Sequence, residues 1–278
     1  MSSTEIPTFD GSQLDAALAE VLERWPLYRR LKYRGGGPIT TVPQRISVHC
    51  TVCENDQIFQ TRFYGGEDNR TGYSYKEYRC RNCDCNSVHF FLYWLPQSDK
   101  SVLFFKAGQF PELEERVPEA LRKALRADLP LYKNALRLRN FNLGIGAVAY
   151  LRRIVENHMN DVLDNIFEAA QLVDPGGDAT AELAQIKASR GFQDKIAFAE
   201  KLLPARLRPE GVPRPLAVLY DLTSDALHAR SDDECIIIFD GCRRIFEYMF
   251  SQLHQENESA RQFKADLALA PGLKPEKR

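Results

Sequence analysis

The fold of the first half of this chain is decided by two short motifs, Cys50-Thr51-Val52-Cys53 and Cys80-Arg81-Asn82-Cys83. Each Cys-x-x-Cys motif places two thiols on one tight turn, and 26 residues separate the two motifs. Two such turns on facing hairpins can complete the tetrahedral four-sulfur shell that Zn²⁺ prefers. We therefore predict one structural zinc site formed by Cys50, Cys53, Cys80 and Cys83.

Other ligand sets and other cysteine chemistry also deserve consideration. Cys85 could replace Cys83 as the fourth ligand, but Cys83 has the two-residue spacing from Cys80. His49 and His89 are lesser candidates, because each can equally serve a structural role. A disulfide pair or buried free thiols fit the spacing less well than a metal does.

The sequence around the cysteines alternates with a period of two, which indicates β-strands. The expected strands are Ile46–Val48, Ile58–Tyr64, Tyr73–Arg79, Ser87–Leu95 and Ser101–Lys106. They predict a small β-rich zinc ribbon over residues 41–110. We expect so small a sheet to have little core of its own, so that the metal supplies much of its folding free energy.

A short helical segment is expected before the ribbon, within residues 1–40. Over Gln13–Tyr33 the apolar residues recur at helical spacing, and Pro26 predicts a break or kink midway. These apolar residues are Leu14, Leu18, Val21, Leu22 and Trp25. Gly35-Gly36-Gly37-Pro38 then reads as a joint leading to the metal module.

From residue 111 onward the pattern is helical. The expected helices are Leu113–Leu129, Tyr132–Arg139, Leu143–Leu172, Thr180–Ser189, Phe192–Leu203, Leu216–Leu227 and Asp232–Leu253. Ser231 and Glu234 match a capping box at the start of the last helix. Cys235 and Cys242 fall on its apolar stripe and are expected in the core. The fold class is thus α+β, with an antiparallel helical bundle over residues 111–255 and a flexible tail over 256–278.

Composition narrows the classes of function. The 278-residue chain has a net charge of −1, which excludes a globally basic nucleic-acid coat but leaves room for a local basic face. The N-terminal residues show no export signal, and no apolar run is long enough to span a bilayer. The expectation is a cytoplasmic protein that does not enter a membrane.

His228 is the residue of chemical interest in the helical half. It lies just before the capped start of the last helix, where the helix dipole disfavours an imidazolium ion and leaves a proton acceptor. Asp225 and Arg230 are nearby polar partners. The alternative is a histidine that only hydrogen-bonds within the turn and fixes the loop.

The helical half resembles an uncharacterised prokaryotic branch of the HEPN superfamily. The resemblance rests on Gly146–Glu156, on Phe192–Ile196 and on Leu222–His228 followed by a capped apolar helix, and it covers roughly Asn140–Leu253. Zinc-ribbon segments also precede such bundles in this broad group. The resemblance implies a bundle that is often dimeric and is associated with RNA handling and antiviral defence.

The resemblance also implies a catalytic pattern that this chain meets only in part. Active HEPN ribonucleases carry an arginine separated from the histidine by four to six intervening residues, and the two promote attack of a ribose 2′-hydroxyl on the adjacent phosphate without a metal. The histidine position falls on His228, but the arginine position falls on Thr223, Leu222 or Asp221. Loss of that cation removes stabilisation of the developing phosphorane charge, typically worth about two to three decades in rate.

Other residues could substitute for the missing arginine. The candidates are Arg230, Arg214, and Arg152 and Arg153, with Glu156 able to orient one of them. Equally, Arg152, Arg153 and Glu156 could form a solvated helix face with local ion pairs. A metal-independent endoribonuclease using His228 is therefore the alternative to a non-catalytic module.

Basic residues suggest where RNA or DNA would bind. One cluster comprises Arg122, Lys123 and Arg126, and a second comprises Lys133, Arg137 and Arg139. In the ribbon, Arg79 and Arg81 flank Cys80, and Tyr73, Tyr75 and Tyr78 precede it. Aromatic and basic residues on a small sheet can bind single strands, although the tyrosines could simply cover one face. The leading hypothesis is a module that binds nucleic acid or a protein partner, and a purely structural adaptor is the third.

Overall fold

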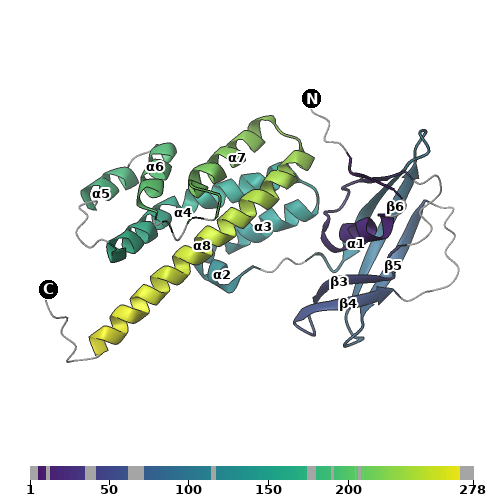
Figure 1. The fold of residues 1–278 in the computed structure, drawn as a ribbon, viewed down its shortest axis with the longest axis horizontal. Helices are drawn as coiled ribbons and strands as arrows, with labels where there is room; N and C mark the ends of the chain where they lie inside the picture. The colour runs from purple at the N-terminus through teal and green to yellow at the C-terminus, as the bar shows by residue number, and fades with distance from the viewer. Residues whose placement is uncertain are drawn as a thin grey trace. The chain divides into compact units, whose positions relative to one another are not determined.

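The computed structural model describes residues 6–10, 13–34, 42–61, 72–113, 117–173, 180–188, 191–203, 205, 208 and 210–269. The chain forms two compact units (Figure 1). The sheet unit comprises Met1–Glu115 and Arg137–Leu143, and the helical unit comprises Arg116–Leu136 and Gly144–Arg278. The fold class is α+β, as predicted.

A single seven-stranded sheet organises the sheet unit. Its strands are β1 (Thr8–Phe9), β2 (Leu31–Tyr33), β3 (Arg45–Cys50), β4 (Asn55–Thr61), β5 (Tyr73–Cys80), β6 (Ser87–Pro96) and β7 (Val102–Phe110). They lie in the order β1-β2-β7-β6-β5-β4-β3. Every neighbouring pair is antiparallel except β1 and β2. Strand β4 thus lies between β3 and β5, and both turns that carry the cysteines follow strands paired with β4.

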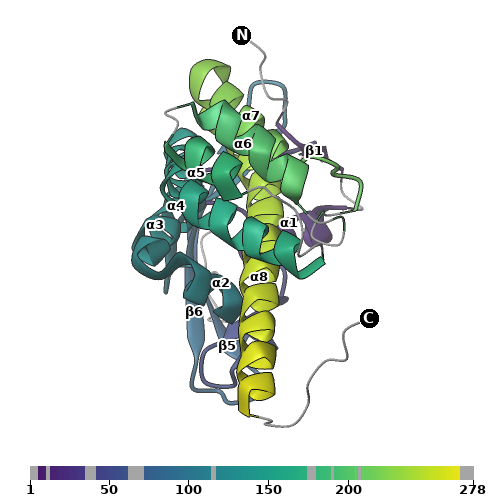
Figure 2. The same ribbon diagram turned by 90° about the vertical axis from the view of Figure 1, so that its left-hand side faces the viewer.

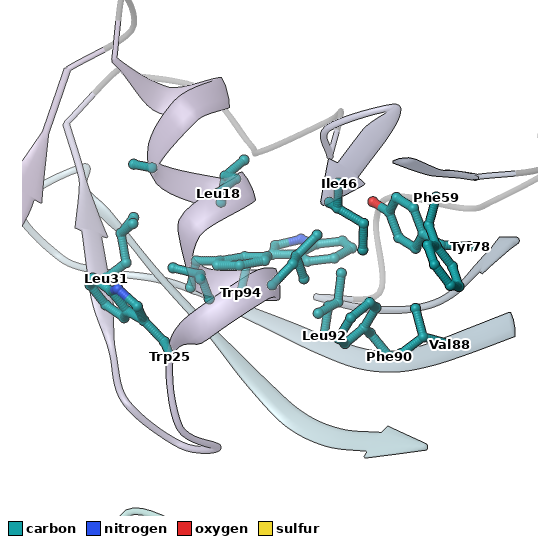
Figure 3. Packing of buried hydrophobic residues seen from close by; sticks show 14 of the residues in the cluster. Leu18, Trp25, Leu31, Ile46, Phe59, Tyr78, Val88, Phe90, Leu92 and Trp94 are labelled. Carbon is teal, nitrogen blue, oxygen red and sulfur yellow. The ribbon is translucent and has the colours of Figure 1, made fainter. Parts of the chain in front are cut away.

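The inner face of the sheet packs against α1 (Leu14–Arg24). Alternate residues of β6 are buried, as a strand with one solvated face requires. Figure 3 shows these side chains gathered with Leu18 of α1 and with residues of the other strands, including Leu31, Phe59 and Tyr78. The sheet thus has a substantial core, and the expectation that it has little core of its own is wrong.

The N-terminal segment differs from the sequence-based expectation. The helix predicted over Gln13–Tyr33 ends at Arg24, because Trp25 adopts an extended conformation (ψ 148°) before Pro26. The chain then returns as β2 into the sheet. Residues 6–10 and 13–34 therefore belong to the sheet unit instead of preceding it as a separate segment. The Gly35–Pro38 joint, and the end of the strand predicted over Ile58–Tyr64, lie outside the described residues.

The helical unit is built mainly around two long helices, α4 and α8 (Figure 2). Its elements are α2 (Glu119–Leu125), η1 (Arg126–Asp128), α3 (Leu129–Asn140), α4 (Gly144–Val173), α5 (Thr180–Ala188), α6 (Phe192–Leu202), α7 (Pro215–Ala229) and α8 (Asp232–Leu269). The last four residues of α3 belong to the sheet unit. None of the described helices is both long and apolar enough to cross a membrane.

The start of α8 follows the sequence prediction, and its end does not. The Ser231 backbone N–H donates to Glu234 Oε2 at 2.9 Å, and the Glu234 N–H points back to Ser231 Oγ at 3.4 Å, which confirms the capping box. Cys235 and Cys242 are fully buried, as expected. The helix continues to Leu269 beyond the predicted end at Leu253, so residues 256–269 are helical and do not form the expected flexible tail.

Candidate functional site

The four predicted cysteines come together at one end of the sheet. Cys50 is the last residue of β3 and Cys80 is the last residue of β5. Strand β4 lies between them and pairs with both. Each following turn contains a residue with positive φ, Glu54 at 56° and Asp84 at 52°, which folds the chain back tightly.

The sulfur atoms have the geometry of a metal centre. The Sγ atoms of Cys50, Cys53, Cys80 and Cys83 all lie within 4.8 Å of one another. Two of the separations are 3.7 Å (Cys50 to Cys83) and 3.9 Å (Cys53 to Cys80). A tetrahedral ion with metal–sulfur bonds of about 2.3 Å would hold its ligands about 3.8 Å apart. These four side chains could therefore hold one metal ion.

Hydrogen-bond donors surround the sulfurs. The Cys53 N–H and the Asn86 side-chain amide donate to Cys50 Sγ, both at 3.4 Å, and the Asn82 amide donates to Cys53 Sγ at 3.3 Å. Hydrogen bonds from the backbone N–H and the side chain of Cys85 lower the pKa of Cys83 to about 6. Such donors favour the thiolate form that binds metals.

The lesser ligand candidates are not part of this cluster. Cys85 is exposed and serves as a hydrogen-bond donor to Cys83. His49 lies 3.6 Å from Asp56, and His89 contacts the Tyr75 hydroxyl and Ser87 Oγ. Among the described residues, the four cysteines are the only group of potential ligands that converges on a metal-sized space.

The outer face of the sheet carries a set of exposed or half-buried aromatic side chains, which we call the aromatic ladder. It comprises Tyr73, Tyr75, Phe91, Tyr93, Phe105 and Phe110, with His89 among them. Phe110 is 71% exposed, and Tyr73 and Phe91 are each 54% exposed. Tyr78, which the sequence grouped with the other tyrosines, points to the inner face and donates to the Pro43 carbonyl at 2.7 Å.

Cross-strand pairing accounts for this ladder. Tyr73 is opposite Tyr93, with ring centroids 5.8 Å apart, and Tyr75 is opposite Phe91, at 5.3 Å. Residues opposite each other in a sheet share a face, so the rings stand in rows. Sequence reasoning singled out the β5 tyrosines but missed the β6 and β7 rings. The alternation of Phe91 and Tyr93 with buried residues was the available signal.

Arginines also lie on or near the outer face of strands β3 to β5. Arg45, Gln60 and Arg79 are opposite one another on three neighbouring strands and share the outer face. A cavity of about 260 Å³ is lined by Gln60, Arg79 and Arg81, among others. Arg79 pairs with Glu77 at 2.5 Å. Within the described part of the chain, the guanidinium groups of Arg45 and Arg81 form no hydrogen bond or ion pair.

The residues predicted for catalysis do not assemble around His228. His228 is exposed in the last turn of α7, not in the loop before α8, so the dipole argument made from sequence loses its basis. Arg230 pairs with Asp225 at 3.1 Å and lies 3.6 Å from Glu234. Arg214 precedes α7 at its opposite end, roughly 20 Å away along the helix axis.

The predicted arginines of α4 have other contacts. Arg152 donates to Glu156 at 2.9 Å and lies over the ring of Tyr220, 4.8 Å from its centroid. Tyr220 is eight residues from His228, or about 12 Å of helix. Arg153 is exposed. In the described residues, no hydrogen bond or ion pair connects any of these arginines to His228.

Most residues of the two predicted basic clusters lie near acidic side chains or are buried. Arg122 and Lys123 lie near Glu119 in α2, at 3.5 and 4.0 Å. Arg137 pairs with Glu112, and Arg139 is buried, where it donates to the Arg24 carbonyl at 3.0 Å. The second cluster therefore offers no continuous basic surface.

No family model, no curated protein and no solved structure matches the chain.

Proposed function

We propose that this chain is a zinc-containing protein that binds single-stranded nucleic acid, RNA or DNA, on the outer face of its sheet. The observation that carries the proposal is the exposed aromatic ladder beside the cysteine cluster. In this proposal the metal fixes the end of the sheet, and the ladder makes the contact. The HEPN resemblance that we expect from the sequence of the helical half would agree with an RNA ligand and a role in prokaryotic defence.

Exposed rings in register suit unpaired bases. Base–aromatic stacking contributes about 1–3 kcal/mol per base and tolerates any sequence. Successive ladder rows are two residues apart, about 7 Å along each strand, so neighbouring bases could stack on successive rows. A duplex hides its base faces within its own stack. The ladder therefore favours single strands over duplexes.

The arginines supply the matching charge. Arg45 and Arg81 are exposed, and both have uncommitted guanidinium groups within the described residues. Arg81 directly follows β5, which carries Tyr73 and Tyr75, and Arg45 lies two strands away on β3. Backbone phosphates of a strand bound on the ladder would meet Arg81 first and Arg45 at the edge of the sheet. Phosphate contacts weaken steeply with salt, whereas stacking contacts do not. The combined site should retain measurable affinity at moderate salt.

Zinc is the metal that we assign to the cysteine cluster. Four thiolates around one point match the tetrahedral sulfur site typical of structural zinc. With four protein ligands the site has no open position for substrate. Its contribution is to folding, and we assign it no chemical step.

The test is fluorescence anisotropy of the full-length, metal-loaded protein with labelled single-stranded RNA, single-stranded DNA and duplexes. We expect single strands to bind more tightly than duplexes. The Tyr75→Ala, Phe91→Ala double variant should weaken single-strand binding at least tenfold, since it removes two stacking platforms. Phe263→Ala, which removes an exposed ring from α8, is the matched control and should have no effect.

Two results would contradict the proposal. Unchanged single-strand binding in the double variant would remove the ladder from the interface, and absence of nucleic-acid binding would favour a structural adaptor. RNA cleavage in EDTA that His228→Ala abolishes would establish the endoribonuclease alternative instead.

A further inference from the structure

A large cavity in the helical unit is independent of both the cysteine cluster and the aromatic ladder. It has a volume of about 590 Å³ and is lined by residues of α2, η1, α4, α5 and α8. Helix α2 packs against α8 beside it (Figure 2). Its size is within the range of roughly 300–1,000 Å³ typical of small-molecule sites.

The lining combines an apolar floor with an ionic rim. Val162, Leu183, Phe250 and Leu253 are buried and form the floor. The rim includes Lys123, Arg126, His254 and Arg261, together with carboxylates. A ligand that fills this space needs one apolar, preferably flat part and one charged part.

Existing ion pairs show which rim charges are free for a ligand. Asp164 pairs with Lys187 at 2.6 Å, Asp161 lies 3.4 Å from His158, and Glu258 lies 3.7 Å from Arg261. Each of these rim carboxylates thus already has a basic partner. His158 Nε2 also lies 3.0 Å from Asp128 Oδ2.

Arg126 and His254 differ from these paired residues of the rim. In the part of the chain that the structure describes, neither side chain forms a hydrogen bond or an ion pair. Arg126 also has a positive φ of 45°, rare for a non-glycine residue, so the backbone places this guanidinium at a cost. The uncommitted donors on the rim are therefore a guanidinium and an imidazole.

We propose that this cavity binds a nucleoside phosphate. The base and ribose would lie on the apolar floor formed by Val162, Phe250 and their neighbours, and the phosphate would accept hydrogen bonds from Arg126 and His254. Lys123 adds positive charge at the same rim. The ligand is either a free mononucleotide or the phosphorylated end of a strand, which present the same chemical group.

Isothermal titration calorimetry of the full chain tests this proposal with AMP, adenosine and a 5′-phosphorylated tetranucleotide. We expect AMP or the tetranucleotide to bind with one-to-one stoichiometry, and adenosine to bind at least about tenfold more weakly. Arg126→Gln and His254→Gln should each weaken the phosphorylated ligand about tenfold, the usual effect of losing one charged hydrogen bond. Arg122→Gln, an exposed arginine of the adjacent helix α2 that lies outside the cavity, is the matched control.

The result that would overturn the proposal is absence of binding by either phosphorylated ligand at millimolar concentration. Equal affinity of the wild type and both cavity variants would also overturn it. The Tyr75→Ala, Phe91→Ala variant should bind AMP normally, so failure of the ladder and failure of this cavity are separate outcomes. Preference for AMP or for the tetranucleotide identifies the source of the phosphate.

Discussion

Gly144 lies where the first turns of α4 and α8 meet, and its lack of a side chain permits the contact. A Cβ atom there would lie 2.2 Å from the Asp232 carbonyl oxygen and 2.8 Å from Cys235 Cβ. The same approach lets the Ile145 N–H donate to Asp232 Oδ1 at 2.9 Å. One residue thus fixes how the two longest helices begin.

We predict that Gly144→Ala lowers the free energy of unfolding by roughly 1–3 kcal/mol, because backbone atoms must move to admit the methyl group. Gly241→Ala is the control, since nothing lies within 4 Å of a Cβ there. In the interior of α8 that change should be neutral or stabilise by up to about 1 kcal/mol. Urea denaturation measures both variants, and equal effects would contradict the assigned role of Gly144.

Lys106 is a cation enclosed by the sheet core. It is 1% exposed, and its Nζ donates to the Leu22 carbonyl at 3.1 Å and to Gln109 at 3.0 Å. Burial, followed by the charge of Arg139, lowers its pKa to about 7. Protonation of Lys106 is therefore less favourable in the folded protein than in the unfolded chain.

The sign of the resulting pH dependence follows from the lowered pKa. Between about pH 7 and the unfolded value of 10.5, the unfolded chain binds more protons at this site, so stability should rise with pH. The gain is limited to about 1.4 kcal/mol per pH unit. We predict that the stability of the wild type relative to Lys106→Met increases from pH 7 to pH 9. A flat difference across this range would show that Lys106 keeps its proton.

The two cysteine turns bring their sulfur atoms together only when β3 and β5 pair with β4 in the correct register. Cys50 and Cys80 end strands that are both paired to β4, and this places four sulfurs within 4.8 Å. The sheet also has its own apolar core with α1. We therefore expect the metal to stabilise the end of the sheet without being needed for the whole sheet to form.

Removal of the ligands tests that expectation. The wild type should hold about one zinc ion per chain by elemental analysis, and the Cys50→Ser, Cys53→Ser variant should lose it. Its melting temperature should fall by several degrees, since about 1 kcal/mol corresponds to roughly 2–4 °C in a chain of this size. Cys85→Ser is the control and should keep the metal. Stoichiometric zinc in the double variant would refute the site.

At the scale of the whole molecule, the chain consists of two units with different chemical resources. The sheet unit offers a cluster of four cysteines that could hold a metal ion and a face of exposed aromatic rings, and the helical unit offers a cavity with an ionic rim. His228, the residue that sequence reasoning favoured for catalysis, belongs to neither feature. Its exposed position and the committed contacts of Arg152 and Arg230 are why binding, not cleavage, leads our proposal.

The sequence by itself determined the features that local spacing controls. It predicted the α+β class, the two cysteine turns, the capping box at Ser231 and the buried stripe of Cys235 and Cys242. Each depends on residues a few positions apart, where helix and strand periodicity or one hydrogen bond decides the outcome.

Tertiary structure decided what depends on pairing between distant segments. The segment after Pro26 became a sheet strand because β7 offered it a hydrogen-bonding edge. The aromatic ladder exists because cross-strand register aligns Tyr73, Tyr75 and the β6 rings. The nucleotide-sized cavity joins side chains more than a hundred residues apart. Such contacts arise from the packing of whole elements, and local periodicity carries no information about which elements will meet.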